Sequence, residues 1–78
     1  MQFAKMPAIS QKCAEPVSTI YWRISSGDFP PPIKQGERAA AFIVEEVDEV
    51  MRARVAGATR DEIRALVRKL VAARGMAA

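Results

Sequence analysis

The 78-residue sequence predicts a mainly α-helical fold with a small β-hairpin wing, a winged helix-turn-helix, followed by one amphipathic C-terminal helix. Three observations lead to this prediction. Two short helical patterns are separated by only a few residues, as in a helix-turn-helix. A proline run then leads into two short segments around a Gly-Glu pair, as in a β-hairpin. Two more helical patterns follow, so we expect a winged helix-turn-helix domain over 1–57 and an appended helix over 58–78.

The first helix is expected at about 7–14. Pro7 suits the first turn of a helix, because the N–H that proline lacks would be unpaired there. Ile9 and Cys13 are four residues apart and therefore share one inward face. We interpret the lone cysteine as a small, partly buried residue and not as a nucleophile. The residues before this helix are expected to be frayed.

The second helix is expected at about 16–26 and ends at Gly27. Ile20 and Ile24 set its buried direction. Its opposite face carries hydroxyl side chains around one tryptophan, and this set comprises Ser18, Thr19, Trp22, Ser25 and Ser26. An exposed tryptophan is unusual on an inert surface. The alternative is that Trp22 is buried against another segment or a neighbouring molecule.

The wing follows a segment that cannot be helical, because it contains three consecutive prolines. The segments "PIKQ" (32–35) and "RAAAF" (38–42) flank the pair Gly36-Glu37. A glycine at that place allows the chain to turn tightly, which favours a short hairpin. Ile33 and Phe42 are expected to point inward.

The third helix is expected at about 44–56. Acidic side chains crowd its first turns and two arginines its last, an arrangement that the helix macrodipole favours. We therefore interpret the acidic stretch 45–49 as a solvated helix start. The apolar stripe of this helix comprises Val47, Val50, Met51 and Val55.

The fourth helix begins at a capping box formed by Thr59 and Glu62 and runs to about Arg74. Its apolar stripe comprises Ile63, Leu66, Val67, Leu70 and Val71, and outside the stripe lie Arg60, Arg64, Arg68 and Lys69. The stripe is too wide to leave in water. It either folds back on the third helix or pairs with another chain, and we expect self-association of these five apolar residues in a homo-oligomer.

The composition of the chain argues for some functions and against others. The 12 basic and 9 acidic residues give a net charge of +3, which is compatible with nucleic acid. The chain has no histidine and one cysteine, which argues against metal sites and against Cys/His or Ser/His/Asp catalysis. We expect no catalytic residues, no metal and no cofactor. A lone cysteine fits the reducing cytoplasm, and no segment reaches the roughly 18 apolar residues of a membrane span.

The stretch "STIYWRISSGDFPPPIKQGERA", followed by "EEVDEV", resembles the AlpA family of phage and prophage regulatory proteins. The family pattern runs Ser-Thr-Ile-Tyr, then Gly-x-Phe-Pro-x-Pro, then Gly-x-Arg and a glutamate-rich helix. The matching residues are Ser18, Thr19, Ile20, Tyr21, Gly27, Phe29, Pro30, Pro32, Lys34, Gly36, Arg38, Glu46 and Val47. The spacing of these motifs is more specific than any one of them.

The resemblance implies a MerR-like winged helix-turn-helix that binds double-stranded DNA in the bacterial cytoplasm. Some relatives regulate transcription, and others are excisionases, or recombination directionality factors, which bend attachment-site DNA and direct an integrase. We expect a sequence-specific transcriptional regulator of a phage, prophage or integrative element. The alternatives are an excisionase, or a protein-interaction module that uses the C-terminal helix to bind an integrase or RNA polymerase. A homo-oligomer would be a dimer or an assembly along DNA.

The same resemblance makes the second helix the recognition helix, whose residues enter the major groove. The DNA-binding candidates are Ser18, Thr19, Tyr21, Trp22, Arg23 and Ser25 on that helix, Lys34 and Arg38 on the wing, and Lys12 on the first helix. Lys34 and Arg38 could reach phosphate or a minor groove; the alternative is that they only solvate a turn. Pro16 stands where relatives have a capping serine, so we expect Glu15 to cap instead.

Overall fold

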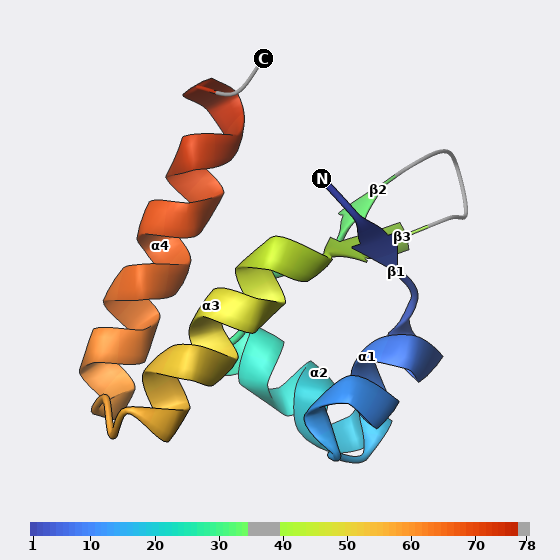
Figure 1. Ribbon diagram of the computed structural model, residues 1–78, viewed down its shortest axis with the longest axis horizontal. Coiled ribbons are helices and arrows are strands. Elements are labelled where there is room, and N and C mark those ends of the chain that lie inside the picture. The colour runs from blue at the N-terminus through green and yellow to red at the C-terminus, as the bar shows by residue number, and fades with distance from the viewer. Residues whose placement is uncertain (35–39, 77–78) are drawn as a thin grey trace.

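The computed structural model describes residues 1–34 and 40–76. It consists of four helices and a small antiparallel sheet (Figure 1), which confirms the predicted winged helix-turn-helix class. The elements are β1 (Phe3–Ala4), α1 (Met6–Cys13), α2 (Val17–Ser26), β2 (Ile33–Lys34), β3 (Ala40–Ile43), α3 (Val44–Val55) and α4 (Arg60–Met76). Within the described residues, no helix has the length and apolar character needed to cross a membrane.

The turn between α1 and α2 forms without the predicted glutamate cap. Ala14 ends α1 in the left-handed conformation with φ of 54°. Pro16 then precedes α2 in an extended conformation, and its carbonyl accepts hydrogen bonds from the N–H groups of Thr19 and Ile20. No side chain caps α2, so the expectation for Glu15 is wrong. The carboxylate of Glu15 instead binds Arg23, whose charge is a stronger partner than a peptide N–H.

The sheet contains one strand more than the sequence predicts. Its order is β1-β3-β2 and both pairings are antiparallel. In the hairpin, Ile33 lies opposite Ala41 and Lys34 opposite Ala40, so the predicted wing is confirmed in the residues described. The turn at Gly36 lies outside them. Strand β1 was missed because a two-residue strand is too short to show an alternating pattern.

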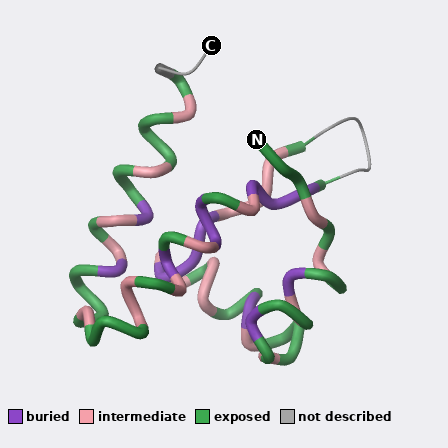
Figure 2. Tube along the Cα trace, in the orientation of Figure 1, coloured by how far each residue is buried: buried purple, intermediate pink, exposed green. Residues whose placement is uncertain are grey.

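The main core lies where α1, α2 and α3 meet the sheet (Figure 2). It comprises Ile9, Cys13, Ile20, Phe29, Phe42 and Val47. The Phe29 and Phe42 rings meet edge to face, with centroids 5.8 Å apart at an interplanar angle of 78°. Phe29 thus anchors the proline-rich connection to the core, while the turn residue Gly27 ends α2 with φ of 82°.

A second apolar cluster joins α4 to α3. Val50 of α3 is buried against Ile63 and Val67 of α4. The predicted capping box is present, because the Glu62 N–H donates to Thr59 Oγ1 at 3.1 Å and the Thr59 N–H to Glu62 Oε1 at 2.7 Å. The folded-back position is therefore the observed one of the two alternatives for this helix.

One member of the predicted α3 stripe is not in either cluster. Val55 is 88% exposed, whereas Val50 is fully buried. At about 100° per residue, five residues turn the helix so that the two side chains point roughly 140° apart. The stripe was therefore assigned too broadly at its C-terminal end.

Candidate nucleic-acid interface

The outward face of α2 keeps its aromatic and hydroxyl side chains accessible. Tyr21 is 57% exposed and Trp22 is 54% exposed. Ser18 and Ser25 are exposed as well, while Thr19 is half-buried. A helix that leaves two adjacent large aromatic residues in solvent offers contact surface for a partner.

One flank of α2 borders the wing. Tyr21 lines an open cleft of about 290 Å³ together with Lys5 near the start of α1 and with Pro32 and Phe42 at the base of the wing. Lys34 on β2 is exposed. Arg38, the other wing candidate, lies outside the described residues. The fold thus brings Tyr21 next to the wing.

The other flank of α2 borders α4. The guanidinium of Arg60 lies over the Trp22 ring at 5.1 Å from its centroid, a cation–π geometry. Trp22 is therefore exposed, as expected, and is not buried against another segment, although Arg60 of α4 contacts one face of its ring. The sequence places Arg60 outside the apolar stripe of the last helix, and its contact with α2 is not evident from the sequence.

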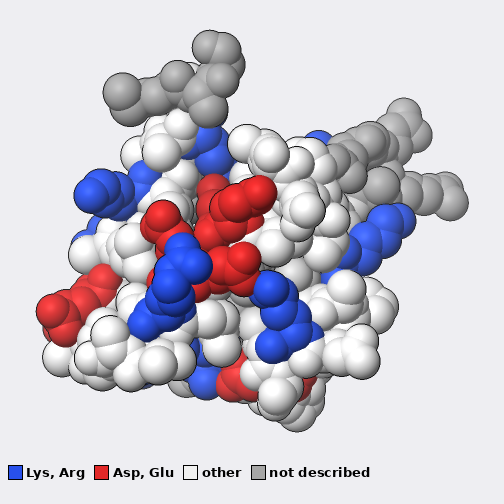
Figure 3. Space-filling view, in the orientation of Figure 1, with Lys and Arg blue, Asp and Glu red and all other residues white. Residues whose placement is uncertain are grey.

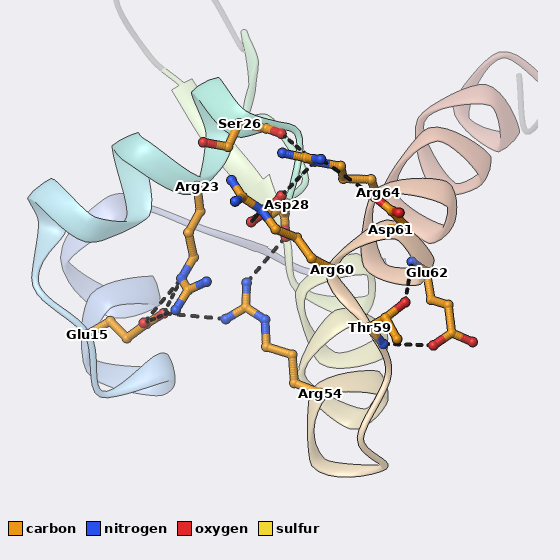
Figure 4. A network of polar contacts seen from close by, with 10 residues as sticks. All are labelled: Glu15, Arg23, Ser26, Asp28, Arg54, Thr59, Arg60, Asp61, Glu62 and Arg64. Atoms are coloured by element: carbon orange, nitrogen blue, oxygen red, sulfur yellow. Dashed lines mark hydrogen bonds and ion pairs between the residues drawn. The ribbon is translucent and has the colours of Figure 1, made fainter.

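Asp28 connects α4 to the end of α2 (Figure 4). Its side chain is buried and accepts from Arg60 Nε at 3.0 Å and from Arg64 Nε at 3.2 Å. Arg64 Nε also donates to the carbonyl of Ser26 at 3.0 Å. A buried carboxylate needs such partners, because losing its hydration is otherwise costly. Asp28 is a site residue that the sequence reasoning missed, since it occupies the variable place in the Gly-x-Phe-Pro motif.

Arg23 is engaged by a neighbouring carboxylate. Its Nη2 lies 2.7 Å from Glu15 Oε2, and its Nε lies 3.1 Å from each oxygen of the same group. These hydrogen bonds hold the pKa of Glu15 below its ordinary value. Arg54 approaches the same carboxylate at 3.5 Å. Burial, and next the positive charge of Arg23, lower the pKa of Arg54.

The acidic stretch at the start of α3 has partners within the chain. Lys12 Nζ, a DNA-binding candidate, lies 2.8 Å from Asp48 Oδ1. Glu46 is buried and accepts from Arg74 Nε at 2.8 Å, and Arg74 also donates to the carbonyl of Pro31 at 2.7 Å. Figure 3 shows acidic side chains gathered near the centre of the face where Figure 1 draws α3. The interpretation as a wholly solvated helix start is therefore wrong for Glu46.

The apolar stripe of α4 that was predicted to self-associate mostly faces α3. Its buried or half-buried members are Ile63, Leu66, Val67 and Leu70. Val71 is 37% exposed. Four of the five apolar residues are thus covered by contacts within the chain. Self-association stays a prediction, with Val71 on the surface that remains available for it.

Comparison with known proteins identifies relatives of most of the chain. The family model described as Prophage CP4-57 regulatory protein (AlpA) matches residues 2–55. The uncharacterized protein ORF88 of Enterobacteria phage P4 is 36% identical over 59 residues, which cover 76% of this chain and 67% of the phage protein. No solved structure matches the chain. The family match includes every element from β1 to α3 and leaves α4 outside it.

Proposed function

Because the chain belongs to the AlpA family of prophage regulatory proteins, we propose that it binds double-stranded DNA sequence-specifically and regulates transcription for a phage, prophage or integrative element. The observation that carries this proposal is the accessible face of α2 next to the wing. A recognition helix must be free to enter the major groove, and α2 leaves Trp22 and two serines, Ser18 and Ser25, exposed.

Most of the candidates have a chemical role in this proposal that follows from their side chains and their contacts. The hydroxyls of Ser18 and Ser25 donate to base edges or phosphates, and Thr19 offers a methyl group to a thymine methyl. Tyr21 and Lys34 contact the backbone from the wing side of α2. Lys12 and Arg23 would have to release Asp48 and Glu15 before they could bind phosphate. We therefore expect these two to contribute less than the exposed Lys34.

The test is DNA binding by the purified chain, with fragments tiled across its gene neighbourhood and any attachment site, at two salt concentrations. Binding confined to a promoter supports the regulator. Binding confined to an attachment site, with bending of the DNA, would instead support the excisionase alternative. No DNA binding at any salt, with binding to an integrase or RNA polymerase, would replace both with an interaction module.

Two variants separate sequence readout from positioning. Trp22→Ala is expected to change the preferred sequence, because Trp22 lies on the face that enters the groove. Lys34→Ala is expected to weaken binding to all sequences alike and to lower the salt slope by about 0.9, the value for one phosphate contact. Lys69→Ala, an equal loss of charge on the exposed part of α4, is the matched control.

A further inference from the structure

The Nε atom of Arg60 is held by a hydrogen bond, while its terminal amino groups have no hydrogen-bond partner in the part of the chain that the structure describes. Its Nε binds the buried Asp28, and its Cζ atom lies over the Trp22 ring. Its two terminal amino groups make no hydrogen bond to any residue among 1–34 and 40–76, and its side chain is 50% exposed. A guanidinium fixed in this way is ready to bind an oxyanion with two parallel hydrogen bonds.

The cleft in front of Arg60 is rich in positive charge. It has a volume of about 270 Å³, and its charged and aromatic lining residues are Trp22, Arg23, Asp28, Arg54 and Arg60. We call it the arginine cleft. Counting Arg64 beside it, four guanidinium groups meet the three carboxylates of Glu15, Asp28 and the exposed Asp61, which leaves a net charge of +1. Arginine stays charged at any physiological pH, so this excess persists.

We propose that the arginine cleft is a second phosphate-binding site, in which Arg60 of α4 holds a backbone phosphate of the bound DNA. This inference rests on the proposed function. It also gives α4, which lies outside the family match, a direct part in binding. The chemistry recognised is a phosphate oxyanion, which could come from DNA or from free phosphate.

The position of the cleft favours DNA as the source. Trp22 belongs both to the cleft and to the exposed face of α2. The wing borders the flank of α2 at Tyr21, and the arginine cleft borders the flank at Trp22 and Arg23. When a helix lies in the major groove, a sugar-phosphate strand runs along each side of it. The wing would contact one strand and Arg60 the other.

The experiment compares the affinity for a target duplex and for an unrelated duplex across a series of salt concentrations. The proteins are the unaltered chain, Arg60→Gln and Arg68→Gln. Arg68 is exposed on the same helix, makes no ion pair with any described residue and does not line the arginine cleft, so it controls for the loss of one charge. Arg60→Lys keeps the charge near Asp28 but lacks the planar fork.

For Arg60→Gln we expect roughly tenfold weaker binding to both duplexes and a salt slope lower by about 0.9, while Arg68→Gln leaves both nearly unchanged. Equal behaviour of the two variants would overturn the inference while leaving the proposed function intact. A change of sequence preference in Arg60→Gln would overturn it too, because that indicates base readout. Absence of DNA binding by the unaltered chain would instead refute the proposed function.

A second measurement distinguishes the two phosphate sources. Trp22 is the single tryptophan of the chain, so its fluorescence reports on binding at the cleft and at the adjoining face of α2. We expect saturable change on addition of duplex DNA and none with millimolar inorganic phosphate. A saturable response to inorganic phosphate that Arg60→Gln abolishes would assign the cleft to a free anion and overturn DNA as the source. If Arg60→Gln unfolds, Arg60→Lys decides. Weaker binding to both duplexes agrees with the inference, because lysine lacks the planar fork, whereas an affinity and salt slope equal to those of the unaltered chain contradict it.

Discussion

The segment from β1 to α3, which the family model matches and which we call the domain, and helix α4 are stabilised in different ways. In the domain, aliphatic and aromatic side chains around Phe29 fill the main core. In α4, the apolar contact with α3 is smaller, and arginines from α4 bind carboxylates of the domain at both ends of the helix. Asp28 receives Arg60 and Arg64, and Glu46 receives Arg74.

This difference shows two ways in which a helix can be held on a fold of this size. Packing depends on the shapes of many side chains together, whereas an ion pair needs only one carboxylate with room for a guanidinium. Two carboxylates bind arginines of α4. Glu46 lies at a position of the family motif, and Asp28 lies at a variable position of that motif. Both carboxylates are buried, and burying a charged group without a partner costs free energy. The arginines of α4 supply hydrogen bonds and opposite charge that offset this cost.

The largest loss in the free energy of unfolding is expected from Phe29→Ala in the main core. Phe29 is fully buried and contacts Phe42 edge to face. Its truncation should lower the free energy of unfolding by about 3–5 kcal/mol, and in so small a domain the whole chain should unfold. Urea denaturation followed by circular dichroism measures this change. A loss below about 1 kcal/mol would mean that the core does not depend on this ring.

A smaller and local effect is expected from Asp28→Ala. The substitution leaves Arg60 and Arg64 without their shared carboxylate, at a cost of about 2–3 kcal/mol because both arginines are partly exposed. We expect α4 to lose hydrogen-exchange protection while α1 and α2 keep theirs. Loss of protection throughout the chain would show that the two regions do not differ in this way.

The next effect concerns pH. The pKa of Glu15 is lowered, chiefly by hydrogen bonds from Arg23. A lowered pKa in the folded chain means that the ion pair contributes stability above the ordinary pKa of 4.5, and that this contribution is lost as the pH falls through the folded value. Glu15→Gln should therefore cost about 1 kcal/mol at neutral pH, and progressively less below about pH 4.5. Denaturation curves of both proteins between pH 7 and pH 3 test the sign; a constant difference would contradict it.

The smallest effect is expected from Val55→Ser. Val55 is 88% exposed at the end of α3, so this change should alter the free energy of unfolding by no more than about 0.5 kcal/mol. Val50→Ala on the same helix, a buried position, is the matched comparison and should cost roughly 1–3 kcal/mol. Equal losses at the two positions would point to a partner surface over Val55 in solution.

The sequence predicts the elements whose residues repeat at helical spacing, and the wing that prolines and a glycine delimit. It also predicts the exposed face of α2, because hydroxyl residues opposite Ile20 and Ile24 define it. It does not reveal β1, which depends on pairing with β3 and carries no pattern of its own. The sequence does not reveal the contact between Asp28 and Arg60 either. The two residues are 32 positions apart, and neither belongs to an apolar stripe that would indicate burial.

The buried thiol of Cys13 makes the opening of the main core measurable over time. Burial, followed by the nearby charge of Glu15, raises the pKa of this group, so little thiolate is present at neutral pH and reagents cannot reach the sulfur in the closed chain. The rate of modification then reports how often the core opens, and the chain has no other cysteine to obscure it. A variant that releases only α4 should be modified as slowly as the unaltered chain.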